Sequence, residues 1–254
     1  MKLISSLVFL SLLPQWLLAQ DIPDFSANYL VKFNGLQAGE LKRTLVTHRN
    51  GTRHFSSATH AKGVFALFKP DFVEESSTFQ SNGGSIIPLS YLYRRTGGKK
   101  EKYLHLDFDW QNQRVYIDDR KQPWKLNIHE NTLDKLVYQL ALMNDLGKGE
   151  TRFSYQIADG GKLKTYNIDK LEPEIISTPL GQIKAVKLIR LRDKSTKRQS
   201  ILWCAPELNY LPIKLEHTEK GGARFTAIIR RLKGFDTQSA FTKSAPKTPQ
   251  FNIK

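Results

Sequence analysis

The sequence predicts a mainly β protein, built as one large curved antiparallel sheet or an incompletely closed β-barrel, with one substantial α-helix. Three observations carry this prediction. Short runs of alternating apolar and polar residues recur along the chain, and turn residues such as Gly, Asn, Asp and Pro separate them. Only one long segment has helical spacing. A sheet with this many inward-facing apolar side chains must also curl on itself to bury them.

The strands are expected to form hairpins. The clearest strand is Tyr103–Trp110, whose apolar residues from Leu104 onward alternate with polar ones, as in an antiparallel strand with one face on the core. Tight turns of the kind that join hairpin strands occur at Asn34-Gly35, Asn50-Gly51, Ser81–Gly84 and Asp159–Gly161. Strands therefore fill most of the chain on both sides of the single helical segment.

That helical segment is residues 132–146. Leu133, Leu136 and Leu140 recur at helical spacing, Asn131 or Thr132 can cap its start, and Gly147 is a natural stop. We expect this helix to cover the concave side of the sheet. The short apolar segment Gly63–Phe68 stays open between a helical turn and a hydrophobic loop.

A late hairpin is predicted over Ser200–Glu216, with a turn that begins near Pro206. Pro212 has no N–H, so its strand should lie at a sheet edge or begin near this residue. Cys204 is the one cysteine in the chain, which rules out an internal disulfide. Its place on an apolar strand favours a small buried hydrophobe over a nucleophile.

The predicted organisation has three parts. Residues 1–19 resemble a cleaved signal peptide, with Lys2 before an apolar run and Ala19 at the expected cleavage site. Residues 20–236 should form a single β-rich domain, and the polar residues 237–254 a disordered C-terminal tail. No cysteine stands at the expected cleavage site, and no later segment is long and apolar enough to span a membrane, so we expect an exported soluble protein without a lipoprotein anchor.

The formal net charge of +15 implies attraction to anionic partners such as phospholipid head groups, lipopolysaccharide or acidic glycans. Export argues against nucleic acid as a binding partner. Two groups of basic and aromatic residues are the candidate ligand-binding residues, since Arg pairs with phosphate or carboxylate and Tyr adds packing area. They are Tyr91, Tyr93, Arg94, Arg95 and Tyr103 in the first group, and Lys184, Arg190 and Arg192 in the second. The alternative is that these basic residues only solvate strand ends and turns.

Catalytic signals are weaker. Asp107 and Asp109 share a strand face about 7 Å apart, and Asp118 and Asp119 follow the next strand, so a glycan-hydrolysing acid–base pair is the alternative to a solvated strand face. We assign no catalytic residues. The six histidines have no metal-ligand spacing, and no phosphate loop or nucleophile motif is present, so we expect neither a metal nor a cofactor.

The order of several segments resembles an uncharacterised family of exported Gram-negative bacterial proteins, catalogued as a domain of unknown function (DUF3108). The segments are Tyr29–Glu40, Ala61–Phe68, Pro88–Tyr93, Phe108–Trp110, Leu133–Leu146 and Trp203–Glu216. The resemblance implies a periplasmic, β-rich domain and supplies no catalytic residues.

Three functions stay open. The leading hypothesis is a non-catalytic periplasmic binding or carrier protein for a lipid-like or anionic component of the cell envelope. The alternatives are a hydrolase of envelope glycan that uses the paired Asp residues, and a structural module that docks to another envelope protein through a sheet edge. The oligomeric state and the ligand's identity do not follow from the sequence.

Overall fold

The computed structural model describes residues 21–68, 71–98, 101–121, 123–191 and 198–242. The strands are β1 (Phe25–Phe33), β2 (Leu36–Thr47), β3 (Arg53–Ala61), β4 (Phe72–Asn82), β5 (Ser85–Thr96), β6 (Lys102–Asp109), β7 (Arg114–Asp118), β8 (Trp124–Asn127), β9 (Leu133–Asp134), β10 (Arg152–Ala158), β11 (Leu163–Thr178), β12 (Gly181–Arg190), β13 (Gln199–Ala205), β14 (Leu211–Thr218) and β15 (Arg224–Lys233). The helices are α1 (Val64–Phe68), the 3₁₀ turn η1 (Pro206–Leu208), α2 (Tyr138–Gly147) and α3 (Thr237–Ala240).

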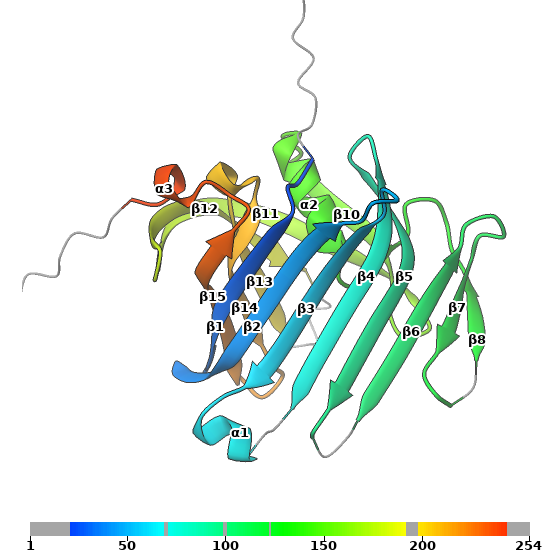
Figure 1. The fold of residues 1–254 in the computed structure, drawn as a ribbon, viewed down its shortest axis with the longest axis horizontal. Helices are drawn as coiled ribbons and strands as arrows, with labels where there is room; N and C mark the ends of the chain where they lie inside the picture. The colour runs from blue at the N-terminus through cyan, green and yellow to red at the C-terminus, as the bar shows by residue number, and fades with distance from the viewer. Residues whose placement is uncertain (1–20, 69–70, 99–100, 122, 192–197, 243–254) are drawn as a thin grey trace, which may run out of the picture.

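Within these residues the strands form one 15-stranded sheet that is not closed into a barrel. Its order is β8-β7-β6-β5-β4-β3-β2-β1-β15-β14-β13-β12-β11-β10-β9. Neighbours are antiparallel except β9 and β10, which run parallel. The sheet curves so that β1–β5 form one wall and β10–β15 curl round behind it (Figure 1). The predicted fold class is confirmed.

The chain enters this sheet in its middle. It builds β1 to β8 in one direction, crosses to the opposite edge at β9, and returns strand by strand to β15. β15 then pairs with β1, with Ser26 opposite Lys233 and Phe33 opposite Phe225. The first and last strands are therefore neighbours.

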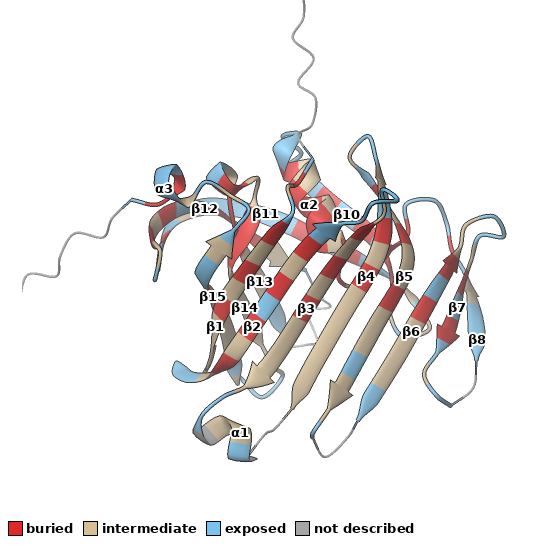
Figure 2. Cartoon of the chain, viewed as in Figure 1, coloured by how far each residue is buried: buried red, intermediate tan, exposed pale blue. Residues whose placement is uncertain are grey.

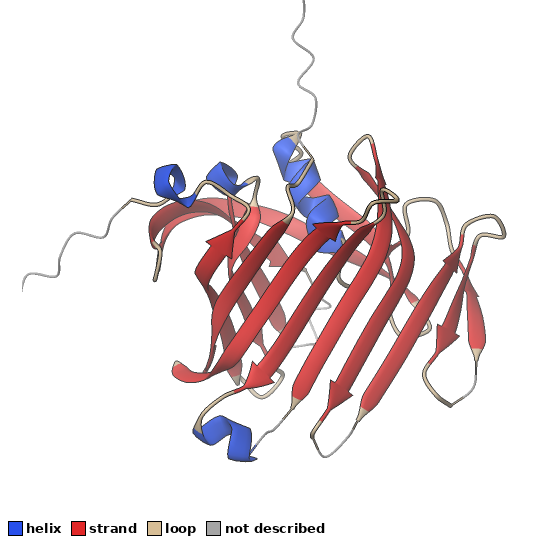
Figure 3. Ribbon diagram, in the orientation of Figure 1, coloured by secondary structure: helices blue, strands red, loops and turns tan. Residues whose placement is uncertain are grey.

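Helix α2 lies inside the curve, near one end of the strands (Figure 3). It is tied to both walls, since Arg43 Nη1 on β2 donates to Gln139 Oε1 (2.8 Å) and the Tyr155 hydroxyl on β10 donates to Asp145 Oδ2 (2.8 Å). Buried segments gather at this end of the sheet, whereas the strand ends near α1 are only partly buried (Figure 2). The core is thus concentrated around α2.

The predicted helix over residues 132–146 is wrong in its first part. Leu133–Asp134 forms the short strand β9, and the helix begins at Tyr138. Thr132 closes a turn with His129 instead of capping a helix. Asp134 explains the difference, because β9 pairs with β10 and the Asp134 carboxylate then accepts the N–H groups of Leu136 and Val137. The helix ends at Gly147, as predicted.

The predicted hairpin turns at Asn34-Gly35, Asn50-Gly51, Ser81–Gly84 and Asp159–Gly161 all join paired strands. The open segment at Gly63–Phe68 contains the single-turn helix α1. Cys204 is fully buried on β13.

Pro212 is not on an edge strand, because β14 has β13 on one side and β15 on the other. It is the second residue of β14, and pairing with β15 begins only at Lys214, so its missing N–H costs no hydrogen bond to β15. The alternative expectation, a strand that begins near Pro212, holds.

The first residues of the disordered tail predicted over residues 237–254 are structured. Thr237–Ala240 forms α3, capped by Asp236, and Thr242 bridges to Gln182 on β12. Side-chain capping and this bridge explain why a polar segment is structured here. Residues 1–20, which include the predicted signal peptide, and residues 243–254 lie outside the described residues.

Candidate functional site

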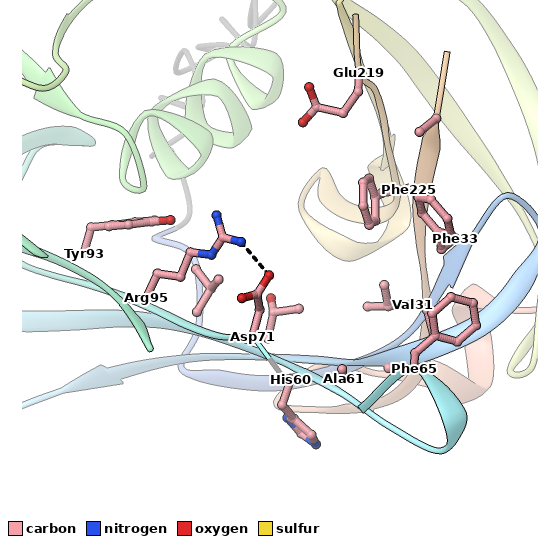
Figure 4. A pocket seen from close by; sticks show the side chains of 15 residues that line it. Val31, Phe33, His60, Ala61, Phe65, Asp71, Tyr93, Arg95, Glu219 and Phe225 are labelled. Atoms are coloured by element: carbon pink, nitrogen blue, oxygen red, sulfur yellow. Dashed lines mark hydrogen bonds and ion pairs between the residues drawn. The ribbon is translucent and has the colours of Figure 1, made fainter. Parts of the chain in front are cut away.

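A cavity of about 800 Å³ opens at the end of the curved sheet that carries α1. Strands β1 to β5, helix α1 and the β14–β15 turn all contribute to its wall, which Figure 4 shows from close by. The lining is mostly apolar, and its labelled members in Figure 4 include Val31, Phe33, Ala61, Phe65 and Phe225.

A second, smaller chamber of about 290 Å³ lies next to the first. The two chambers share Val31, Thr59 and Phe225 as lining residues, so they are adjacent. Tyr138 and Gln139, from the first turn of α2, also line the small chamber. Helix α2 therefore forms the inner boundary of a space that opens on the α1 side.

Side-chain size explains why this end of the sheet is hollow. The inward residues of β1 are fully buried up to Tyr29, but Val31 and Phe33 beyond it are only half-buried. On β2, Gly39 occupies the inward position opposite Val31, and a Cβ there would lie 2.3 Å from the backbone oxygen of His60. Gly39 therefore adds no side chain here, and its backbone forms part of the cavity wall.

The mouth of the cavity carries charged groups that are already paired. Arg95 Nη2 lies 2.5 Å from Asp71 Oδ2 (Figure 4), and this hydrogen bond raises the pKa of Arg95. Across the opening, Glu219 pairs with Arg198 at 3.2 Å and lies 3.4 Å from His217 Nε2. The mouth is thus polar without a strong excess of either charge.

The first group of predicted ligand-binding residues divides between the two faces of the sheet. Tyr93 and Arg95 line the cavity, and Tyr91 is buried, with its hydroxyl donating to Glu75 at 2.7 Å. Arg94 is exposed and pairs with Glu74. Tyr103, which lies opposite Arg94 in the β5–β6 ladder, stacks under Arg120.

The second predicted group is likewise divided. Lys184 is exposed on β12. Arg190, at the end of the same strand, is half-buried, and its Cζ lies 3.4 Å from the centroid of the Tyr166 ring. Arg192 lies outside the described residues.

The four candidate acidic residues lie away from the cavity. Asp107 is exposed, and Asp109 accepts hydrogen bonds from the backbone and side chain of Asn112 in the β6–β7 turn. Asp118 and Asp119 accept the N–H groups of Arg120 and Lys121 after β7. Three of the four thus serve turns, and none lines either chamber.

Sequence reasoning missed Arg43 and Gln139. Arg43 occupies an inward position of β2 between Leu41 and Leu45, with only 7% of its surface exposed. A charged residue in the apolar register of a strand was the available signal. Among the described residues, no group of three His, Cys, Asp or Glu side chains is placed to hold a metal ion, and no helix is long and apolar enough to cross a membrane.

Similarity to one known structure supports the fold. A beta-barrel-like protein of the domain of unknown function DUF1849 from Brucella abortus superimposes with a TM-score of 0.55 at 10% identity, covering 85% of this chain and 100% of that one. A protein from Parabacteroides distasonis ATCC 8503, provisionally named a lipoprotein, gives a TM-score of 0.32 at 11% identity, with 84% and 96% coverage. No curated protein matches the chain in sequence. The family model for proteins of unknown function DUF3108 matches residues 28–229, so the chain belongs to this family.

Proposed function

We propose that the protein is a non-catalytic binding or carrier protein of the bacterial cell envelope, which takes a lipid-like molecule into its interior. The observation that carries the proposal is the apolar cavity of about 800 Å³ with its adjoining chamber. Small-molecule sites in proteins are typically apolar spaces of about 300–1,000 Å³ with a few polar groups. The apolar N-terminal run with its Lys2 supports an exported, periplasmic location.

Catalysis receives less support from the geometry. Of the acidic residues that a glycan hydrolase would need, Asp109, Asp118 and Asp119 hold turns beside β6 and β7, and Asp107 is exposed. General acid–base chemistry requires two carboxyl groups that face one substrate position. Binding in the cavity needs no such arrangement.

The proposal is tested with a neutral apolar fluorophore whose emission rises when it leaves water. The wild-type protein should bind N-phenyl-1-naphthylamine, and Val31→Trp should weaken that binding at least about tenfold, because Val31 lines both chambers. Val46→Trp is the matched control, since Val46 lies on β2 with 45% of its surface exposed. Val31→Phe is a milder second variant in case the larger side chain disturbs folding.

Two results would overturn the proposal. One is a wild-type protein that binds no apolar probe. The other is a correctly folded Val31→Trp or Val31→Phe variant that binds the probe as tightly as wild type does.

A further inference from the structure

Two arginines lie behind the inner end of the cavity, next to Tyr138 and Gln139 in the first turn of α2, which line the small chamber. Arg43 donates from Nη1 to Gln139 Oε1 at 2.8 Å, and Gln139 lines the small chamber. Arg190 stacks on Tyr166, whose ring lies 5.3 Å from that of Tyr138, another lining residue. The two guanidinium groups therefore flank the Tyr138–Gln139 turn from opposite walls.

Neither arginine has an acidic partner among the described residues. Their ion pairs and hydrogen bonds comprise only the bond from Arg43 to Gln139, and the Nε atoms of both are buried without an acceptor. Arg43 also lies 5.9 Å above the Tyr29 ring, which supplies a weak cation–π contact. Arg43, with 7% of its surface exposed, is a buried cation with little compensation, which is costly because desolvation removes its water without supplying an anion.

The arginines at the mouth behave differently. Arg95 pairs with Asp71, and Arg198 with Glu219. The arginines near the mouth therefore have direct acidic partners, whereas the two beside Tyr138 have none within the described residues. Removing an unpaired buried charge should stabilise a protein, so its presence is best explained by a partner that arrives with the ligand.

The charges of both arginines reach Tyr138. Burial raises the pKa of Tyr138, the charges of Arg190 and Arg43 act against that rise, and the charge of Glu75 adds to it. The Tyr138 hydroxyl makes no hydrogen bond within the described part of the chain and can donate to an anion beside the two guanidinium groups.

We propose that Arg43 and Arg190, with Tyr138, form an anion site that receives the head group of a long-chain amphiphile bound head-first, its chain running outward past Val31 and Phe225 to the mouth. The ligand class is a single-headed lipid anion with a carboxylate or phosphate group, which guanidinium groups bind through paired N–H donors. This inference rests on the proposed function, since the chain must occupy the apolar cavity.

The test compares a fluorescent fatty acid, cis-parinaric acid, with its methyl ester, which has the same chain and no charge. The wild-type protein should bind the acid at least about tenfold more tightly than the ester, because only the acid can accept charge-assisted hydrogen bonds from the guanidinium groups. Arg43→Met should reduce the affinity for the acid to that for the ester and leave the ester's affinity unchanged. Arg190→Met should have the same direction of effect.

Arg230→Met is the matched control, because Arg230 is an exposed arginine that pairs with Glu40 outside the cavity. It should leave both affinities unchanged. Urea unfolding of Arg43→Met without ligand should show a midpoint equal to or above that of wild type, since Met fills a similar volume without an unpaired charge. A midpoint clearly below wild type would show that Arg43 is a structural residue and overturn the proposal.

The outcomes distinguish the anion site from the proposed function. Equal binding of acid and ester by wild type would overturn the anion site while leaving an apolar-ligand protein. Failure of both to bind would overturn the proposed function itself. Inorganic phosphate alone raising the unfolding midpoint as much as cis-parinaric acid would show a site for a free anion and overturn the amphiphile.

Discussion

Asp134 provides the sharpest test of the energetics of this fold. Its carboxyl group is fully buried where β9 ends and α2 is about to begin, and it accepts hydrogen bonds from Ser77 Oγ (2.5 Å) and from the N–H groups of Leu136 and Val137. Desolvation outweighs these bonds and raises the pKa of Asp134 from 3.8 to about 6. Ionised Asp134 therefore destabilises the fold at neutral pH.

The magnitude follows from linkage. A folded-state pKa about two units above the unfolded value costs about 3 kcal/mol once the group is ionised in both states, at about 1.36 kcal/mol per unit. Because the folded pKa is the higher one, this stability is fully present below pH 3.8 and is lost as the pH rises through about 6. The titration window is therefore roughly pH 4–6.

Asp134→Asn should remove that titration while keeping an oxygen acceptor for Leu136 and Val137. The free energy of unfolding, measured by urea at several pH values, should rise relative to wild type by about 3 kcal/mol between pH 3.8 and pH 7. The other carboxyl groups contribute to both proteins and cancel in this difference. Parallel curves for the two proteins would refute the reasoning.

Asp24→Asn serves as a control of opposite sign. Burial acts to raise the pKa of Asp24, but hydrogen bonds from Thr47 and the charge of Arg53 lower it overall. Wild type should therefore be more stable than Asp24→Asn at neutral pH, and its advantage should shrink as the pH falls through the folded pKa.

Two further predictions concern packing. Burial raises the pKa of the Cys204 thiol, so Ellman's reagent at pH 8 should not modify the native protein. In unfolding concentrations of urea the reagent should modify one thiol per chain. Rapid reaction in the native state would contradict the burial. Gly39→Ala should lower the free energy of unfolding by about 1–3 kcal/mol, because the new Cβ would lie 2.3 Å from a backbone oxygen. The control Gly147→Ala should not lower it, because the space around Gly147 is open. Equal urea midpoints for both variants would contradict this prediction.

The strand architecture could be predicted from the sequence because alternation and Gly-containing turns are local signals. The break at residues 133–137 could not, since the same leucines that suggest helical spacing are used first in a strand and then in a turn held by Asp134. Its carboxylate acts as a cap only because β9 pairs with β10, a contact between distant segments.

The candidate site shows the same division. Runs of Arg and Tyr identified Tyr93, Arg95 and Arg190, which do face inward, but adjacent residues such as Arg94 face the other way because side chains alternate along a strand. Arg43 was missed because it follows Lys42 in a mixed polar segment, where only its alternation with Leu41 and Leu45 shows that it points inward. Its significance depends on α2 being placed against it.

The pairing of β1 with β15 has a consequence for how the molecule assembles. The eight strands made first leave one edge of β1 unpaired until the last strand, about 190 residues later, arrives to cover it. Contacts this distant in sequence slow folding, because a long loop must close before they form. A rearranged gene that joined the neighbouring ends at Phe25 and Lys233 and opened the chain between β8 and β9 would instead place every adjacent strand pair next to each other in sequence. We expect such a circularly permuted chain to fold into the same sheet faster. This result would show that the late pairing of β1 with β15, rather than chain length, limits the folding rate.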